Sequence, residues 1–132
     1  MTDEIKQQLI RLALTAREKA YAPYSHYNVG AAILADDGRL FGGCNVENAS
    51  YGLTNCAERT AIFTAVAAGA YGVRAVVVAT DDGGSPCGAC RQVISEFSPK
   101  DGTPVPVFLI DSAGNVIRET SIAELLPFAF SF

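Results

Sequence analysis

Three cysteines in two short segments constrain the fold of this chain more than any other feature. Cys56 lies in the segment T-N-C-A-E-R, and Cys87 and Cys90 lie in the segment S-P-C-G-A-C-R. Three thiolates suffice for a tetrahedral zinc with one open position, whereas structural zinc sites fill all four positions. If the three cysteines share one ion, the fold must bring both segments together. Glu58 places a carboxylate beside that ion, which is a catalytic arrangement.

Both cysteine segments have the residues of helix starts. Thr54 or Asn55 can cap a helix that places the first cysteine in its first turn. Ser85 can cap another, with Pro86 at the first helical position, so that the C-x-x-C pair follows on one helix face. A helix N-terminus stabilises negative charge and lowers the pKa of a thiol. The sequence therefore predicts two helix N-termini that converge on one zinc ion.

Length and composition predict one globular domain, 1–132, that binds a small ligand. The chain has 132 residues, of which 49% are hydrophobic and 18% charged, a composition that excludes a disordered chain. The formal net charge is −4, and the ten Lys and Arg residues are scattered. Proteins that bind long nucleic acids usually carry a basic face, because phosphate neutralisation dominates their affinity. We therefore expect no nucleic acid polymer as partner.

The start of the chain, M-T-D-E-I-K-Q-Q, lacks the apolar region of a signal peptide. No apolar run reaches the length of about 18 residues that a membrane span needs. We expect a cytoplasmic protein with no membrane partner. In a reducing compartment its four cysteines are metal ligands or free thiols rather than disulfides.

Hydrophobic periodicity and turn residues predict a three-layer α/β/α fold around a mixed five-stranded sheet. Strand–helix–strand units favour parallel neighbours, but the last connection has only about five residues, so the final strand should be antiparallel. The predicted elements, in chain order, are a helix at 3–20 capped by Thr2 or Asp3, a hairpin of strands 29–35 and 39–46, a helix at 55–68, a strand at 73–79, a helix at 87–97, strands 105–110 and 116–119, and a helical turn at 121–126.

The cysteines and charged residues also have simpler interpretations. A C-x-x-C pair alone can be a redox pair or half of a zinc ribbon. Cys44 could complete a closed four-cysteine site, although its place in a predicted strand favours a buried free thiol. Glu58 or Arg59 could be a plain surface residue of a helix. His26, the sole histidine, is assigned no role.

Five motifs give the chain a specific resemblance to a known family. They are A-P-Y-S-H-Y-N-V-G-A-A at 22–32, G-C-N-V-E-N-A-S-Y at 43–51, C-A-E-R-T-A at 56–61, P-C-G-A-C-R-Q-V at 86–93 and E-L-L-P at 124–127. With these motifs the chain resembles the small homotetrameric cytidine deaminases that act on free nucleosides. The pairing of a cysteine-ligated zinc with a nearby glutamate before P-C-x-x-C also fits zinc nucleobase deaminases in general.

The resemblance implies the chemistry of the site. Cys56, Cys87 and Cys90 would hold one zinc per subunit, and the zinc would activate a water for attack on C4 of cytosine. Glu58 would shuttle a proton to N3 and then to the leaving amine, releasing ammonia and uridine in pyrimidine salvage. Arg59 matches a residue that hydrogen-bonds the ligand sulfurs, and such a cation restores the electrophilicity of zinc among three thiolates.

The resemblance also implies substrate contacts. Asn45 and Glu47 match residues that hydrogen-bond the ribose hydroxyls, although the residues alone are equally compatible with turn formation. The backbone of Ala57 matches a contact to the base. Tyr27 stands where the family often has Phe, packing near the base or sugar.

Two aromatic residues are expected to contact neighbouring subunits. Tyr51 and Phe130 match positions that reach the site of a neighbouring subunit in a homotetramer. From composition alone, the C-terminal P-F-A-F-S-F segment could be a hydrophobic plug, but exposed aromatic residues favour an interface.

The leading hypothesis is hydrolytic deamination of cytidine and 2′-deoxycytidine. Three alternatives remain: deamination of a cytosine-containing antibiotic, editing of cytosine in RNA, and a zinc-stabilised binding module with a closed site that uses Cys44. The Asn45–Glu47 pair favours a ribose, and the acidic composition disfavours RNA.

Overall fold

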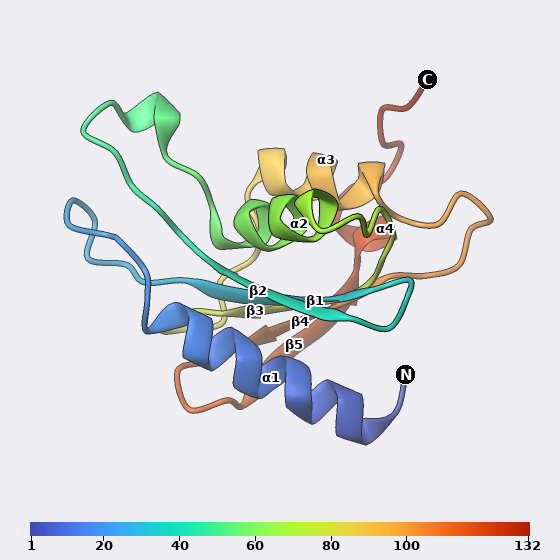
Figure 1. Ribbon diagram of the computed structural model, residues 1–132, viewed down its shortest axis with the longest axis horizontal. Helices are drawn as coiled ribbons and strands as arrows, with labels where there is room; N and C mark the ends of the chain where they lie inside the picture. The colour runs from blue at the N-terminus through green and yellow to red at the C-terminus, as the bar shows by residue number, and fades with distance from the viewer.

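One mixed sheet of five strands forms the centre of the computed structural model, which describes residues 1–132 (Figure 1). The strands are β1 (Gly30–Ala35), β2 (Leu40–Cys44), β3 (Val73–Ala79), β4 (Pro106–Ile110) and β5 (Val116–Ser121). The helices are α1 (Asp3–Arg17), α2 (Ala57–Ala67), α3 (Gly88–Glu96) and the short α4 (Ile122–Leu125), with a 3₁₀ turn η1 (Tyr51–Leu53). The predicted fold class is confirmed.

The strand order is β2-β1-β3-β4-β5, and only β3 and β4 are parallel neighbours. The final strand, β5, is antiparallel to β4, as the short connection predicts. The expectation that each strand–helix–strand unit gives parallel neighbours holds for β3-α3-β4 and is wrong for β2-α2-β3. There β1 lies between β2 and β3 and is antiparallel to both, so β2 and β3 run in the same direction without being neighbours.

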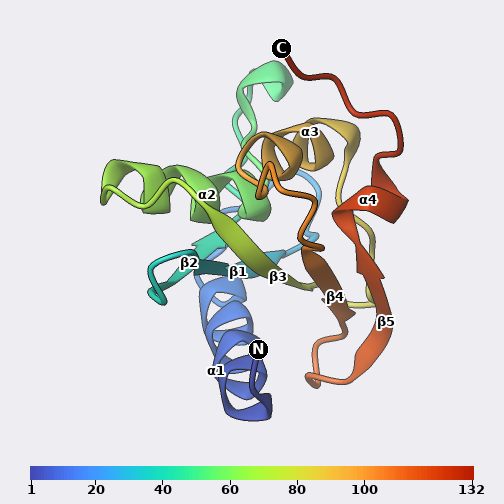
Figure 2. The same cartoon turned by 90° about the vertical axis from the view of Figure 1, so that its right-hand side faces the viewer.

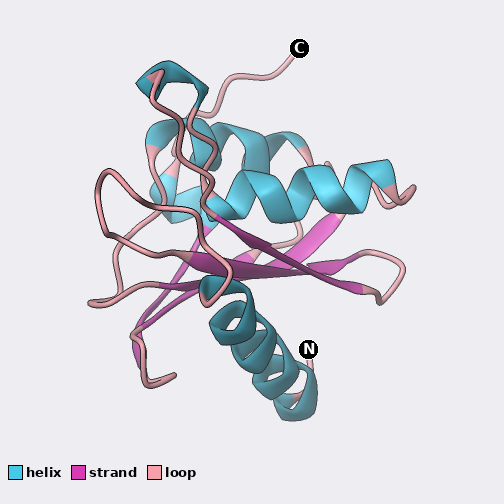
Figure 3. Ribbon diagram, turned by 60° about the vertical axis from the view of Figure 1, so that its left-hand side comes forward, coloured by secondary structure: helices cyan, strands magenta, loops and turns pink.

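The central strands are apolar on both faces because helices cover both (Figures 2 and 3). Helix α1 covers one face and buries Leu9, Ile10 and Ala13 against Ala32 and Val77. Helices α2 and α3 cover the other face together with α4. The core of that face includes the fully buried Ile33, Ile62, Val76, Ile94 and Val107. The two helices that contain the cysteine segments are therefore neighbours on one side of the sheet.

The predicted bounds of the elements differ from the observed ones by one to three residues at most ends. Thr2 caps α1, since its hydroxyl oxygen accepts a hydrogen bond from the Ile5 backbone nitrogen at 3.2 Å. Helix α1 ends at Arg17 because Glu18, Lys19 and Ala20 form tighter turns. None of the helices is both long enough and apolar enough to span a bilayer.

Candidate zinc site

Helices α2 and α3 start beside each other, and a cysteine is the N-cap residue of each. Cys56 is the N-cap of α2, and Cys87 is the N-cap of α3. The sulfur of Cys87 accepts a hydrogen bond from the backbone nitrogen of Cys90 at 3.5 Å. The helix dipole therefore favours negative charge on both sulfurs, whereas a backbone N–H bond stabilises only that of Cys87.

The predicted caps of these helices are wrong by one or two residues, because each candidate side chain is engaged elsewhere. The Thr54 hydroxyl accepts from the Asn48 backbone nitrogen at 3.3 Å. The Asn55 side-chain amide donates to the Thr60 hydroxyl at 3.1 Å, and the Asn55 backbone forms a bridge with Val46. The Ser85 hydroxyl accepts from the Arg91 guanidinium at 2.9 Å.

The three sulfurs have the separations of a tetrahedral metal site. The Cys56 and Cys87 sulfurs are 3.7 Å apart, and the Cys87 and Cys90 sulfurs are 3.5 Å apart. All three lie within 4.8 Å of one another. Zinc–sulfur bonds of about 2.3 Å in tetrahedral geometry place sulfurs about 3.8 Å apart, so these residues fit zinc. Cys44 is not part of this group, and it is a half-buried free thiol at the end of β2.

The ionisation of the thiols also fits a cation. Hydrogen bonds from Cys90 and Arg59 lower the pKa of Cys56 to about 5. The pKa of Cys90 is raised well above its ordinary value, because its thiol donates to Cys56 and because it is buried. One sulfur therefore ionises at the expense of another, whereas a divalent cation between them deprotonates coordinating thiols together.

Arg59 extends from the first turn of α2 back to the sulfurs. Its guanidinium Nη2 donates to the Cys56 sulfur at 3.3 Å, and this contact raises the pKa of Arg59. Its Nε is buried without a hydrogen-bond partner. Leaving such a donor unpaired is costly, so contact with the negatively charged sulfur has to hold the guanidinium there.

Glu58 lies in the first turn of α2 and is only 4% exposed. Burial raises its pKa to about 7, and the nearby charge of Cys56 adds to the effect. A carboxyl group with a pKa near neutrality can both take up and release a proton at physiological pH.

A cleft of about 270 Å³ opens above the cysteines and has space for a small ligand. Seven residues predicted for the site line it, namely Tyr27, Asn45, Glu47, Cys56, Ala57, Glu58 and Cys87. They come from four separate stretches of the chain. Cys90 and Arg59 lie behind this lining.

Asn45 and Glu47 hold the loop at 22–28 that forms one wall of the cleft. The Asn45 amide accepts from the Val29 nitrogen at 2.9 Å and donates to the Tyr27 carbonyl at 2.8 Å. The Glu47 carboxylate accepts from the backbone nitrogens of Tyr24 and Ser25 and from the Ser25 hydroxyl, and these bonds lower its pKa. Both side chains therefore hydrogen-bond the 22–28 loop and also line the cleft.

Seven of the 14 lining residues were not predicted for the site, and they include Ser25, Thr80 and Gly84. Thr80 follows β3 directly, and ligands of α/β sheets bind beyond the carboxyl ends of strands, so its position was a usable signal. Ser25 lies in the P-Y-S turn, and its hydroxyl accepts from the Tyr27 backbone nitrogen at 3.0 Å. Nothing in the local pattern marked Gly84.

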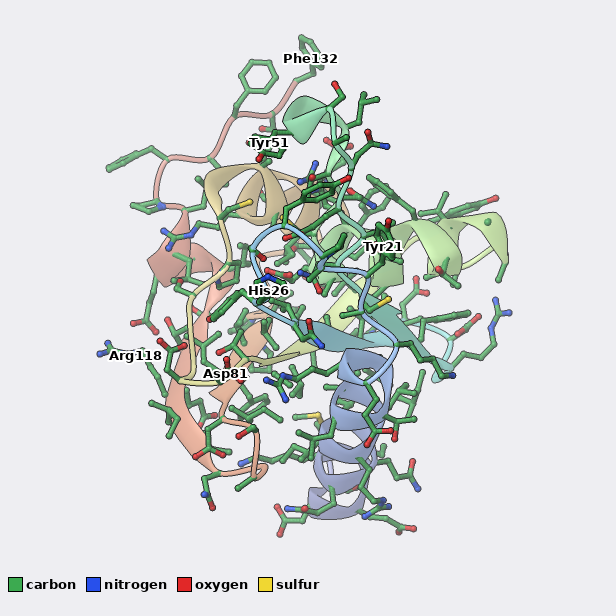
Figure 4. All side chains as sticks on the ribbon, turned by 90° about the vertical axis from the view of Figure 1, so that its left-hand side faces the viewer. Tyr21, His26, Tyr51, Asp81, Arg118 and Phe132 are labelled. Atoms are coloured by element: carbon green, nitrogen blue, oxygen red, sulfur yellow. The ribbon has the colours of Figure 1, made fainter.

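Tyr51 and Phe130 lie outside the cleft of their own chain. Tyr51 is 75% exposed and packs edge-on against Tyr24, with ring centroids 5.9 Å apart. Phe130 is 66% exposed and contacts Phe132 in the same way at 5.2 Å. Tyr51 and the tail that ends at Phe132 both project on the side of the sheet that α2 and α3 cover (Figures 1 and 4). His26 has a positive φ of 57° in the 22–28 loop.

The fold and this site define a metal-dependent enzyme class, in which an ion on three thiolates lies beside a buried carboxyl group at the floor of a small cleft. Known proteins specify the class further. A family model described as "Cytidine and deoxycytidylate deaminase zinc-binding region" matches residues 3–105. A cytidine deaminase from Sporosarcina psychrophila is 53% identical over 127 residues, which cover 95% of this chain and 90% of that protein. One from Halalkalibacterium halodurans is 51% identical over 128 residues, covering 96% and 94%.

A solved structure agrees with the sequence relatives. The crystal structure of cytidine deaminase from Burkholderia pseudomallei superposes with a TM-score of 0.85 at 52% identity, covering 98% of this chain and 100% of that chain. The chain therefore belongs to the family of cytidine and deoxycytidylate deaminases that share this zinc-binding region.

Proposed function

We propose that this protein is a single-domain enzyme that deaminates cytidine and 2′-deoxycytidine to uridine and 2′-deoxyuridine, with release of ammonia. The observation that carries the proposal is the convergence of three thiols and the buried carboxyl group of Glu58 at one cleft of about 270 Å³. The relatives named cytidine deaminase, which match nearly the whole chain, support the same activity.

In this proposal Cys56, Cys87 and Cys90 hold one zinc, and Glu58 moves the protons. Bound zinc lowers the pKa of a water toward neutrality and so supplies the nucleophile that hydrolysis needs. Glu58 would take one proton from the attacking water and give it to N3 of cytosine as the C4–O bond forms. It would then take the second proton from the hydroxyl group on C4 and give it to the amine as the C4–N bond breaks, which leaves the C4 carbonyl and ammonia. The raised pKa of Glu58 suits both steps. Arg59 positions the Cys56 sulfur through their hydrogen bond.

The remaining lining residues position the nucleoside. Asn45 and Glu47 hydrogen-bond the ribose hydroxyls, a role that is supported by their place in the lining of the cleft. The backbone of Ala57, at the start of α2, contacts the base. Tyr27 packs beside the base or the sugar, since its ring lines the cleft.

The exposed aromatic residues and the charge of the chain bear on its assembly and its substrate. Tyr51 and Phe130 reach the clefts of neighbouring subunits in a homotetramer, which their large exposed aromatic surfaces support. The enzyme acts in the cytoplasm in pyrimidine salvage. The net charge of −4 disfavours an RNA substrate, and the exclusion of Cys44 from the thiol group disfavours a closed binding module.

The decisive experiment is the cytidine-to-uridine absorbance assay with zinc stoichiometry measured on the same sample. We expect one zinc per chain and turnover of both nucleosides. Glu58→Gln should retain zinc and assembly but lower kcat by at least about 100-fold, since general acid–base catalysis contributes that much. Glu96→Gln, an exposed substitution at the end of α3, is the control and should behave as wild type. Near wild-type turnover in Glu58→Gln would show that the mechanism is wrong.

A further inference from the structure

Asp82, a residue outside the cleft lining, connects two of the loops that form the cleft. The hydroxyl group of Tyr27 donates a hydrogen bond to its Oδ1 at 2.9 Å. The hydroxyl of Thr80 donates to the same oxygen at 3.3 Å. The loop at 22–28 and the loop at 81–86 are far apart in sequence, and this carboxylate joins them.

The connection continues along the second loop toward the metal ligands. Thr80 accepts a hydrogen bond from the Gly84 backbone nitrogen at 2.7 Å, and Gly84 precedes Ser85, Pro86 and Cys87. Tyr27, Thr80, Gly84 and Cys87 all line the cleft. The network therefore runs from the aromatic wall of the cleft to the start of α3.

Asp82 has a fixed position from which to act. Its backbone forms a bridge with Asp111 at the end of β4, so that it is attached to the sheet. Burial raises the pKa of Tyr27, which keeps its hydroxyl group protonated and able to donate. A Cβ atom at Gly84 would lie 2.8 Å from that hydroxyl oxygen. Any other residue at position 84 would therefore displace the tyrosine hydroxyl.

We propose that Asp82 is a positioning residue of the active site, which fixes the Tyr27 ring against the substrate through the tyrosine hydroxyl. This inference rests on the proposed function. A ring tethered at both its backbone and its hydroxyl loses little freedom when a nucleoside packs on it, so the tether lowers the cost of binding. The hydroxyl is the part of Tyr27 that a phenylalanine would lack, and Asp82 gives that hydroxyl its function.

The test measures kcat and KM for cytidine in zinc-loaded Tyr27→Phe, Asp82→Ala and Asp82→Asn. Loss of one neutral-to-charged hydrogen bond should raise KM by about three- to tenfold in the first two variants, with kcat and zinc content within about twofold of wild type. Asp82→Asn keeps an acceptor oxygen and should restore KM to within about twofold of wild type. The double variant Tyr27→Phe/Asp82→Ala should have the same KM as Asp82→Ala, because Asp82→Ala already removes the bond that Tyr27→Phe deletes.

Matched controls separate this effect from general loss of stability. Tyr71→Phe changes a remote, 66% exposed tyrosine, and Asp101→Ala removes a carboxylate that accepts from Thr103 in a distant turn. Neither should change KM. Gly84→Ala is an independent perturbation that displaces the Tyr27 hydroxyl without deleting a partner, and it should raise KM as well.

An unchanged KM in Tyr27→Phe would overturn the proposal. It would also be overturned if the increases in KM of the two single variants multiplied in the double variant. A lowered melting temperature with unchanged KM in Asp82→Ala would show a structural role only and would also overturn it. An inactive zinc-loaded wild type would instead refute the proposed function, so the two failures are distinguishable.

Discussion

Gly43 sets the distance between the sheet and α2, the helix that carries Glu58. It lies in β2, pairs with Ala31 of β1 and contacts the helix directly. A Cβ atom at this position would lie 2.4 Å from the Ala61 nitrogen, 2.6 Å from the Ala57 carbonyl oxygen and 2.9 Å from the Ala61 Cα. All three are backbone atoms of α2, so no side-chain rotation relieves the contact. Gly43→Ala therefore forces the helix away from the sheet by about 1 Å.

We expect this displacement to reduce both stability and activity. Overpacking of this kind costs about 1–3 kcal/mol of unfolding free energy. The smaller conformational freedom of alanine in the unfolded chain returns about 0.4–1 kcal/mol, leaving a net loss. Because Glu58 and the N-terminus of α2 move with the helix, kcat should fall by up to about 100-fold, the effect of a misplacement near 1 Å.

The neighbouring glycine provides the control. A Cβ atom at Gly42 points to the other face of the sheet, where it would meet the side chain of Leu12 at 3.1 Å and the Cβ of Ala16 at 3.6 Å. The leucine can rotate, so Gly42→Ala should stay within about 1 kcal/mol of wild type in urea unfolding, with unchanged kcat. The reasoning is refuted if the two variants prove equally stable and equally active.

Three further predictions concern single side chains. Arg59→Gln should lose zinc to a chelator about 10- to 100-fold more readily than wild type, because the cation beside the Cys56 sulfur is removed, and equal retention would contradict this contact's role. Cys44→Ala should keep full zinc content and activity, measured by metal analysis and turnover, whereas loss of zinc would indicate a fourth thiolate. The folded-state pKa of Glu47 lies below its ordinary value of 4.5, so its hydrogen bonds stabilise the protein above that pH, and the stabilisation is lost as pH falls through the lowered pKa. The stability difference between wild type and Glu47→Ala in urea should therefore shrink below pH 4.5, and a constant difference down to about pH 3 would disprove the assignment.

The elements with purely local causes were predictable from the sequence. The strand at 73–79 has its predicted bounds, because an apolar run between glycine and polar loop residues leaves no alternative ends. The starts of α2 and α3 were not predicted, because cap preferences favour Ser, Thr and Asn, and here sulfurs take the N-cap positions. Metal-site chemistry replaced the ordinary capping preference at both helices.

Contacts between residues far apart in the chain were harder to predict from the sequence. Cys56, Cys87 and Cys90 were predicted to meet, and their sulfurs do lie together, since the motif spacing itself implies a shared ion. The bond between Tyr27 and Asp82 joins residues 55 positions apart, and no periodicity or spacing rule indicates such a pair. Tyr51 and Phe130 do not line their own cleft, which agrees with the resemblance that assigns them to a neighbouring subunit's site.

The charge balance of the site explains why it lies at two helix starts. Three thiolates carry more negative charge than a zinc ion neutralises, and a buried carboxyl group beside them adds to the excess. Each helix N-terminus contributes the equivalent of about half a positive charge, and Arg59 adds a full one at 3.3 Å from a sulfur. These contributions offset the excess without occupying a coordination position, so a zinc ion held here would keep its electrophilicity and have a position free for water. The helix starts therefore serve the chemistry of the site, since Cys56 and Cys87 lie at the positive ends of two helices and the Cys87 sulfur also accepts a backbone N–H bond there.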